Sequence, residues 1–126
     1  MFDHVQLTVK SFERSLAFYT AALAPFGITR RVSFPGFPGH APLEGIGDAK
    51  EHYVMLREGK PAGTSVHFAL RAKSKKVVDA FYKAAIAAGG KDNGPPASRP
   101  NYFAAYYAAY VLDPDGYNIE AVFQGA

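Results

Sequence analysis

The two halves of this chain repeat one pattern with an offset of 63 residues. Residues 4–11 (HVQLTVKS) align without a gap on residues 67–74 (HFALRAKS). Further pairs in the same register are Phe18 with Phe81, Tyr19 with Tyr82, and Gly27 with Gly90. A gapless internal repeat predicts two copies of one structural unit. We refer to residues of about 1–60 as the first unit and residues of about 61–126 as the second unit.

Each unit begins with a stretch that has one apolar face. Apolar residues alternate with other residues over 5–9 in the first unit and over 66–70 in the second, which is typical of a half-buried strand. Ser11 and Ser74 follow these stretches. A short hydroxyl side chain can accept hydrogen bonds from the first turn of a helix, so both serines are predicted N-caps.

A helix is predicted after each serine, at about 12–24 and 75–88. Apolar residues recur there at helical spacing and give each segment one apolar stripe. Gly27 and Gly90 follow the two segments. Because a helix exit favours a residue that tolerates positive φ, we expect these glycines to end the helices.

Strands are predicted in the rest of each unit. They cover about 28–34, 40–46, 51–57, 106–112 and 117–123. Turn signals separate them at Pro35-Gly36, at Gly45–Gly47 and at Asp113–Gly116, whereas Asn93–Pro100 is rich in proline and glycine. The predicted class is α+β: two tandem βαβββ modules form a cupped mixed sheet with the helices on its outer face.

Composition favours a single domain over residues 1–126. The chain has 126 residues, of which 48% are hydrophobic, enough for one core. No apolar run approaches the roughly 18 residues of a membrane span, and the N-terminus lacks the pattern of a signal peptide. We therefore expect a cytoplasmic protein with no membrane partner. Without cysteine, a metal could be held only by histidine or oxygen donors.

The charge pattern does not favour nucleic-acid binding. The net charge is +3, and a basic cluster lies where a strand is expected to meet a helix. Its members are Arg71, Lys73, Lys75 and Lys76. A solvated helix start of this kind is common, and no stacking motif or recognition helix accompanies it. No nucleic-acid partner is expected.

Three polar residues are predicted on the concave face. If the helices cover the apolar faces of the strands, then His4 and His67 project to the opposite side. Glu120 projects there too, from an otherwise apolar strand, where a carboxylate is costly unless it is paired or bound to a metal. His40, in a Pro/Gly-rich segment, and His52, at a strand start, are expected to have surface or hydrogen-bonding roles.

Four segments resemble the vicinal oxygen chelate superfamily, which includes glyoxalase I, fosfomycin and bleomycin resistance proteins and extradiol dioxygenases. They are Asp3–Leu7, Ala17–Tyr19, Val66–Ala69 and Asp113–Glu120, and together they span nearly the whole chain. In that family the tandem units hold a divalent metal with side chains from the first and last strand of each unit. By position, the resemblance implies His4, His67 and Glu120 as the ligands.

The fourth ligand position expected from the family is not a carboxylate here. One alignment of the two units places Met55 opposite Glu120, and another places Val54 there. A thioether is a poor ligand for a hard divalent ion, so Met55 is expected to line the pocket instead. Glyoxalase I itself is disfavoured, because members of that group resemble one another in having a carboxylate at this position.

Further residues are candidates for substrate binding. Gln6 and Arg57 are expected to face the cup, where Arg57 could pair with an anionic substrate oxygen. Tyr106 and Tyr110 belong to a group of aromatic residues near the C-terminus. That group fits either a pocket lining or ordinary strand packing, since tyrosine suits both.

Two classes of function follow from the resemblance. The first is an enzyme that uses Fe, Mn, Zn or Ni at two histidines and one carboxylate, with open positions for a small oxygen-chelating substrate. Its chemistry would be of lyase, isomerase or dioxygenase type. The second is a metal-free protein that sequesters a small molecule, as bleomycin resistance proteins do. Related proteins are commonly homodimers, so a homodimer is expected by analogy.

Overall fold

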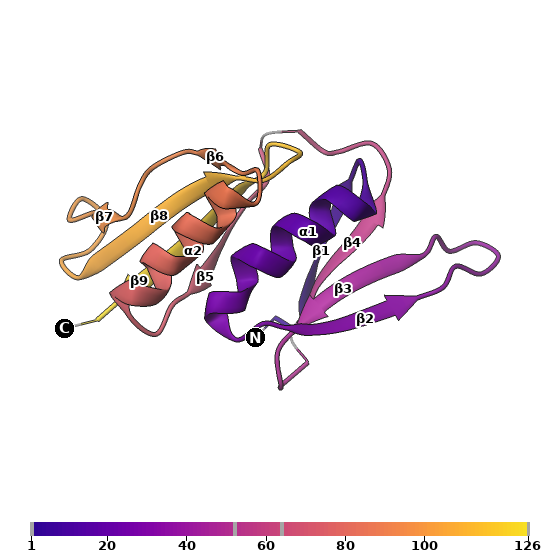
Figure 1. Ribbon diagram of the computed structural model, residues 1–126, viewed down its shortest axis with the longest axis horizontal. Helices are drawn as coiled ribbons and strands as arrows, with labels where there is room; N and C mark the ends of the chain where they lie inside the picture. The colour runs from indigo at the N-terminus through magenta and orange to yellow at the C-terminus, as the bar shows by residue number, and fades with distance from the viewer. Residues whose placement is uncertain (1, 52, 64, 126) are drawn as a thin grey trace.

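The computed structural model describes residues 2–51, 53–63 and 65–125, and it contains two similar halves (Figure 1). The first unit consists of β1 (His4–Val9), α1 (Phe12–Leu23), the 3-10 helix η1 (Ala24–Phe26), β2 (Arg30–Phe34), β3 (Leu43–Gly47) and β4 (Tyr53–Glu58). The second unit consists of β5 (His67–Arg71), α2 (Lys75–Ala87), β6 (Lys91–Asp92), β7 (Ala97–Ser98), β8 (Tyr106–Leu112) and β9 (Asn118–Gln124).

Each unit forms its own mixed sheet. The strand order is β1-β4-β3-β2 in the first sheet and β5-β9-β8-β6 in the second, where β7 also pairs with β8. β1 and β4 are parallel, as are β5 and β9, and the other pairs are antiparallel. The predicted α+β class and its tandem modules are confirmed, with the strands divided between two hydrogen-bonded sheets.

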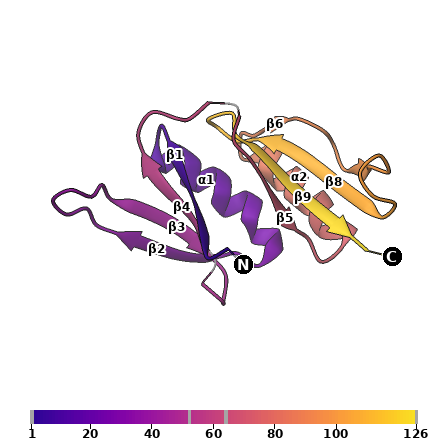
Figure 2. The ribbon, with the colours of Figure 1, turned by 180° about the vertical axis from the view of Figure 1, so that it is seen from behind.

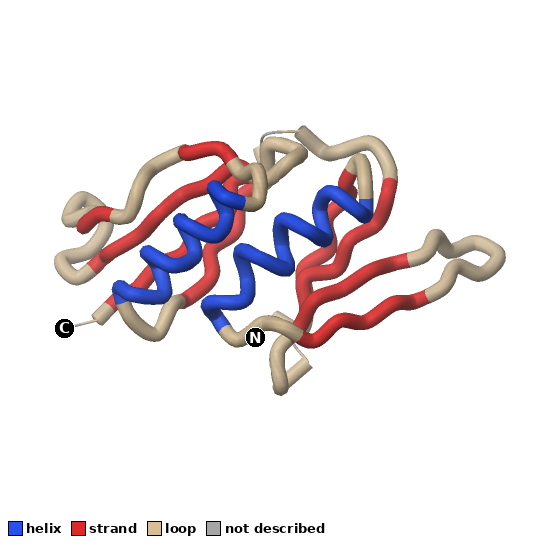
Figure 3. Tube along the Cα trace, in the orientation of Figure 1, coloured by secondary structure: helices blue, strands red, loops and turns tan. Residues whose placement is uncertain are grey.

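Both helices cover the same side of the two sheets. α1 and α2 lie side by side and contact each other (Figures 1 and 3), and the view from behind shows the sheet faces that no helix covers (Figure 2). Side chains from both units form one continuous core, in which Leu7 and Ile119 from the sheets join Phe18 and Phe81 from the helices. Within the described residues, no helix has the length and hydropathy of a membrane-spanning segment.

The helices begin where the sequence predicts. Ser11 Oγ accepts from the backbone N–H of Arg14, and Ser74 Oγ accepts from that of Val77, each at 3.3 Å. Both serines have extended backbone conformations, as N-cap residues require.

The predicted helix exits are only half correct. Gly27 has positive φ (78°), but it closes η1, which extends the chain beyond α1. After α2 the positive φ belongs to Gly89 (100°), so the prediction for Gly90 is wrong. A Cβ atom on Gly90 would lie 2.7 Å from Phe18 Cε1 and 2.5 Å from Val111 Cγ1. Gly90 is therefore needed for close packing between the units.

Two further predictions about strands need correction. Gly45 and Gly47 do not form a turn, because both lie inside β3. The turn comes after them, where Asp48 O accepts from Glu51 N at 3.1 Å and Glu51 takes a positive φ of 67°. The Pro/Gly-rich stretch 93–100 also contains the short strand β7, which pairs with β8.

A buried carboxylate joins the second unit to α1. Asp113 is 4% exposed. It accepts from the Tyr19 hydroxyl at 2.5 Å, from Asp115 N at 2.8 Å and from Tyr117 N at 2.9 Å. Burial raises the pKa of Asp113 above its ordinary value, although these three hydrogen bonds act in the opposite direction.

Neighbouring contacts extend this junction. Asp115 pairs with the Arg14 guanidinium at 2.8 Å and accepts from Lys10 N at 3.3 Å. The Tyr117 hydroxyl donates to Thr8 O and accepts from Ala62 N at 2.9 Å. The turn between β8 and β9 is therefore fixed to β1 and α1 of the other unit.

Replacing Asp113 should weaken the fold strongly. In Asp113→Ala the buried Tyr19 hydroxyl loses its acceptor, so the free energy of unfolding should fall by about 2 to 4 kcal/mol in urea denaturation. Asp79 is a matched control because its carboxylate is exposed and also accepts from a tyrosine hydroxyl, that of Tyr107 at 2.7 Å. Asp79→Ala should cost about 0.5 kcal/mol or less. Equal losses in the two variants would contradict the role of this junction.

Candidate functional site

The register of the parallel strand pairs identifies equivalent positions on the uncovered faces of the two sheets. The paired residues are His4 with Tyr53 and Gln6 with Met55 in the first unit, and His67 with Asn118 and Ala69 with Glu120 in the second. Met55 therefore occupies the position of Glu120. Val54 is buried in the core on the opposite face, which decides between the two alignments.

The turns that precede β4 and β9 support the same equivalence. Asp48 O accepts from Glu51 N at 3.1 Å, and Asp113 O accepts from Gly116 N at 2.9 Å. Glu51 and Gly116 both have positive φ, at 67° and 88°. Met55 follows Glu51 by four residues, and Glu120 follows Gly116 by the same number. The carboxylate of the second unit is therefore replaced by a thioether in the first unit.

Two of the three predicted metal ligands lie together. His67 Nε2 is 3.2 Å from Glu120 Oε1. The Glu120 side chain is 4% exposed and that of His67 is 44% exposed, so the pair has one deep member and one that reaches the surface. The Tyr106 hydroxyl donates to the other carboxylate oxygen of Glu120. Glu120 is thus paired, as its burial requires.

Hydrogen bonds fix the tautomers of both strand histidines. His67 Nδ1 is 2.9 Å from the backbone carbonyl of Asn118, and His4 Nδ1 is 2.7 Å from the Asp3 carboxylate. Since a carbonyl and an ionised carboxylate only accept hydrogen bonds, Nδ1 carries the proton in each ring. Each ring thus has one nitrogen held by a partner, and its Nε2 atom faces away from that partner, as in a metal-ligating histidine with a supporting hydrogen bond.

Tyrosines surround the His67–Glu120 pair. The Tyr110 ring stacks on His67 with centroids 6.3 Å apart. Burial and, next, the charge of Glu120 raise the pKa of Tyr110 to about 12. Burial and the hydrogen bond to Glu120 also raise the pKa of Tyr106. The Arg99 guanidinium lies 5.4 Å from the Tyr110 ring centre.

The aromatic group therefore divides between two environments. Tyr106 and Tyr110 lie on the Glu120 face, as predicted for a site. Tyr107 instead bonds to Asp79 of α2 at 2.7 Å, and Tyr117 is buried in the core. The alternation of side chains along β8 separates Tyr106 and Tyr110 from Tyr107. Strand packing accounts for Tyr107 and Tyr117, and a substrate-binding role for Tyr106 and Tyr110 stays a prediction.

His4 lies at a cavity of the first unit. This cavity measures about 470 Å³, and Gln6, Met55 and His40 also line it. His40 is exposed and its backbone bonds to that of Phe37, in line with the expected surface role, and its position in the cavity lining adds a feature that the sequence did not indicate. Arg57 is exposed and is not among the residues that line this cavity.

A second cavity, of about 660 Å³, is lined by both His4 and His67, from the edge strands β1 and β5. Across the described residues, however, no three His, Asp or Glu side chains are grouped as metal ligands. His67 and Glu120 are brought together, while His4 lies outside that pair, so the three-ligand site stays a prediction. His52 lies outside the described residues.

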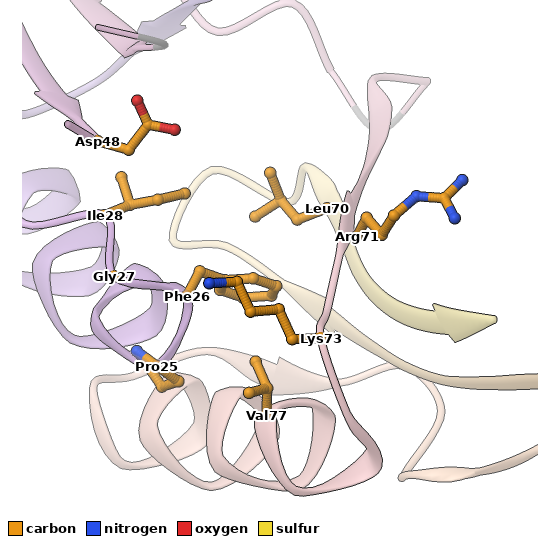
Figure 4. A pocket seen from close by; sticks show the side chains of 9 residues that line it. All are labelled: Pro25, Phe26, Gly27, Ile28, Asp48, Leu70, Arg71, Lys73 and Val77. Atoms are coloured by element: carbon orange, nitrogen blue, oxygen red, sulfur yellow. The ribbon is translucent and has the colours of Figure 1, made fainter. Parts of the chain in front are cut away.

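A third cavity, of about 380 Å³, lies near η1 and the start of α2 (Figure 4). Apolar side chains such as Phe26 and Val77 dominate its lining, together with Lys73. None of the predicted site residues reaches it.

Comparison with protein families identifies the family. The family model described as "Glyoxalase/Bleomycin resistance protein/Dioxygenase superfamily" matches residues 1–121. The chain belongs to this superfamily. A comparison with curated proteins finds no match.

Solved structures of this superfamily share the fold. A glyoxalase/bleomycin resistance protein from Albidiferax ferrireducens T118 is 30% identical, with a TM-score of 0.82 and 99% of both chains covered. A fosfomycin resistance protein from Listeria monocytogenes, a mutant complexed with Mn(II) and 1S,2S-dihydroxypropylphosphonic acid, is 18% identical. Its TM-score is 0.68, with 96% of this chain and 87% of that chain covered. The latter likeness concerns the fold alone.

The charge of Glu120 should be measurable at Tyr110. In Glu120→Gln the pKa of Tyr110, about 12, should fall, because a neutral amide no longer opposes the tyrosinate. A pH titration of ¹³C-labelled tyrosine by NMR would measure it. Asp79→Asn is the control. It should lower the pKa of Tyr107, because the hydrogen bond to Asp79 is the largest cause that raises this pKa. The pKa of Tyr110 should not change. An unchanged pKa of Tyr110 in Glu120→Gln would contradict the placement of the Tyr110 ring beside the Glu120 carboxylate.

Proposed function

We propose that this protein is a divalent-metal-dependent enzyme that acts on a small molecule with two adjacent oxygen atoms, by lyase, isomerase or dioxygenase-type chemistry. The proposed ligands are His4, His67 and Glu120, and the proposed ion is Fe, Mn, Zn or Ni. Two histidines and one carboxylate suit these ions and leave coordination positions for a substrate.

The observation that carries this proposal is the geometry of the His67–Glu120 pair. Two neighbouring donor atoms that bind one ion at about 2.0 to 2.2 Å lie about 2.8 to 3.6 Å apart across octahedral and tetrahedral coordination. The 3.2 Å between His67 Nε2 and Glu120 Oε1 falls in that range. A direct charge-assisted hydrogen bond is usually shorter, about 2.7 to 2.9 Å.

The third ligand would come from a second copy of the chain. His4 has the same tautomer as His67, but in one chain it lies apart from the pair. In the sheets that the described residues form, β1 and β5 are edge strands, each paired with one other strand. Such edges are available for assembly. A homodimer in which the first unit of one copy faces the second unit of the other would bring His4 to His67 and Glu120.

When bound, the ion would polarise the two substrate oxygens and stabilise negative charge that develops on them. The chain's own residues position the ligands. Tyr106 holds one oxygen of Glu120, so a single carboxylate oxygen stays free for ligation. Met55 supplies no carboxylate at the equivalent position, and this supports a reaction other than that of glyoxalase I.

A specific observation also favours the second candidate, a metal-free binding protein. The first unit has a cavity of about 470 Å³ with aromatic and aliphatic walls, within the usual range for small-ligand pockets. Such a pocket could sequester a ligand without chemistry. Metal analysis separates the two candidates.

Protein purified without a chelator or affinity tag should bind Mn(II) or Zn(II), which equilibrium dialysis with metal analysis would measure. His67→Ala and Glu120→Gln should each weaken binding by about 100-fold or more, since even loss of a supporting residue costs about 10- to 100-fold. Tyr106→Phe should cost about tenfold for that reason. His40→Ala, which lies outside the ligand set, should bind normally. No metal in wild type, or full binding in Glu120→Gln, would overturn the enzyme proposal.

Mixing variant chains tests the shared site. His4→Ala chains and Glu120→Gln chains each lack one ligand, from different units. If sites are shared between copies, heterodimers regain one intact site, and about one quarter of the wild-type sites should return after mixing. A mixture of His67→Ala and Glu120→Gln chains should recover none, because both changes affect the second unit. Failure of the first mixture to regain metal binding would refute the shared site.

A further inference from the structure

The uncovered faces of the two units differ at one pair of equivalent positions. Gly45 pairs with Met55 across β3 and β4, whereas Tyr110 pairs with Glu120 across β8 and β9. Since Met55 and Glu120 are equivalent, Gly45 takes the place of Tyr110. The second unit carries a tyrosine ring at this position, whereas the first unit has no side chain there.

Glycines allow two side chains to form the floor of the first-unit cavity. A Cβ atom on Gly45 would lie 2.5 Å from Met55 Sδ, and one on Gly47 would collide with the Tyr53 ring. The Met55 thioether and the Tyr53 ring thus lie over β3, in space that any other residue would occupy. Both line the cavity. A polarizable sulfur and an aromatic ring suit contact with another aromatic ring.

Aromatic rings form the wall of this cavity. The backbone of Phe37 and His40 is joined by hydrogen bonds of 3.1 and 2.8 Å, and their rings are 4.4 Å apart. Phe34 is 50% exposed and Phe37 is 62% exposed, and both line the cavity. Large exposed aromatic side chains that rim one cavity favour an apolar occupant.

The charges around the cavity disfavour an anion. Among the described residues that line it, the charged ones are Asp3 and Glu51, with no lysine or arginine. Asp3 bonds to His4, and Glu51 lies 4.0 Å from Arg30. An anionic ligand would find no cation in the lining to compensate for its desolvation.

Polar atoms are available on β1. Gln6 carries an amide on the same face as His4, two residues further along the strand, and both residues line the cavity. The amide oxygen of Gln6 can accept a hydrogen bond from a ligand hydroxyl.

We propose that the first unit binds a neutral, hydroxyl-bearing aromatic ring in this cavity, and that the second unit supplies the reacting centre. The inference rests on the proposed function in one respect: His4 is both a lining residue and the third metal ligand, so the bound ring would lie next to the metal. Ring binding itself requires no metal, which keeps the two proposals separately testable.

The test uses 2-naphthol as a neutral aromatic probe and 2-naphthalenesulfonate as its anionic counterpart, with the 126-residue protein in excess chelator. Calorimetric titration should show binding of 2-naphthol, and the sulfonate should bind at least about tenfold more weakly, because nothing in the lining neutralises it. Equal binding of the two probes, or no binding of 2-naphthol at millimolar concentration, would overturn the proposal.

Matched variants locate the probe. Phe37→Ala should raise the dissociation constant for 2-naphthol about tenfold through loss of ring contact. Phe103 is 63% exposed, like Phe37, but belongs to the second unit, so Phe103→Ala should leave binding within about twofold. Glu120→Gln should retain 2-naphthol binding even where it loses metal. An equal effect of the two phenylalanine changes would overturn the assignment to the first unit.

Discussion

The buried carboxylate of Asp113 is the interaction on which the geometry of the site depends. It fixes the start of β9 by accepting from two backbone N–H groups of its own turn, and it fixes that turn to α1 through the Tyr19 hydroxyl. Glu120 lies on β9 a few residues further along. The position of the site carboxylate relative to the first unit is therefore set by a polar contact that carries no chemistry itself. The turn at Asp113–Gly116, which the sequence predicts, is therefore a junction between the two units.

Much of the fold and half of the site could be predicted because the signals are local. Strand alternation predicts which side chains of β1, β5 and β9 share a face, and that is enough to bring His67 and Glu120 together. Helix starts were predictable for the same reason, since Ser11 and Ser74 act on the next turn of the chain. Because the repeat shows each local pattern in both units, a chance origin of the pattern is less credible.

What could not be predicted depends on contacts between distant segments. The role of Gly90 comes from Phe18 and Val111, which no local pattern connects to it. Gly45 and Gly47 read as a turn because glycine usually marks one, whereas here they make room for side chains of the neighbouring strand. The position of His4 relative to the His67–Glu120 pair likewise depends on how the two units are arranged, and a repeat along the sequence does not specify that arrangement.

The two histidines also differ in how firmly they are held. Asn118, whose backbone carbonyl orients His67, belongs to β9, the strand that carries Glu120, so one backbone ladder positions both members of the pair. His4 is oriented by the Asp3 carboxylate, and that side chain is 84% exposed. A contact to an exposed side chain is more easily rearranged than a contact within a sheet. The second unit thus holds the His67–Glu120 pair in a fixed arrangement, whereas His4 lies at the surface beside the first-unit cavity, where its orientation depends on a contact that rearranges more easily.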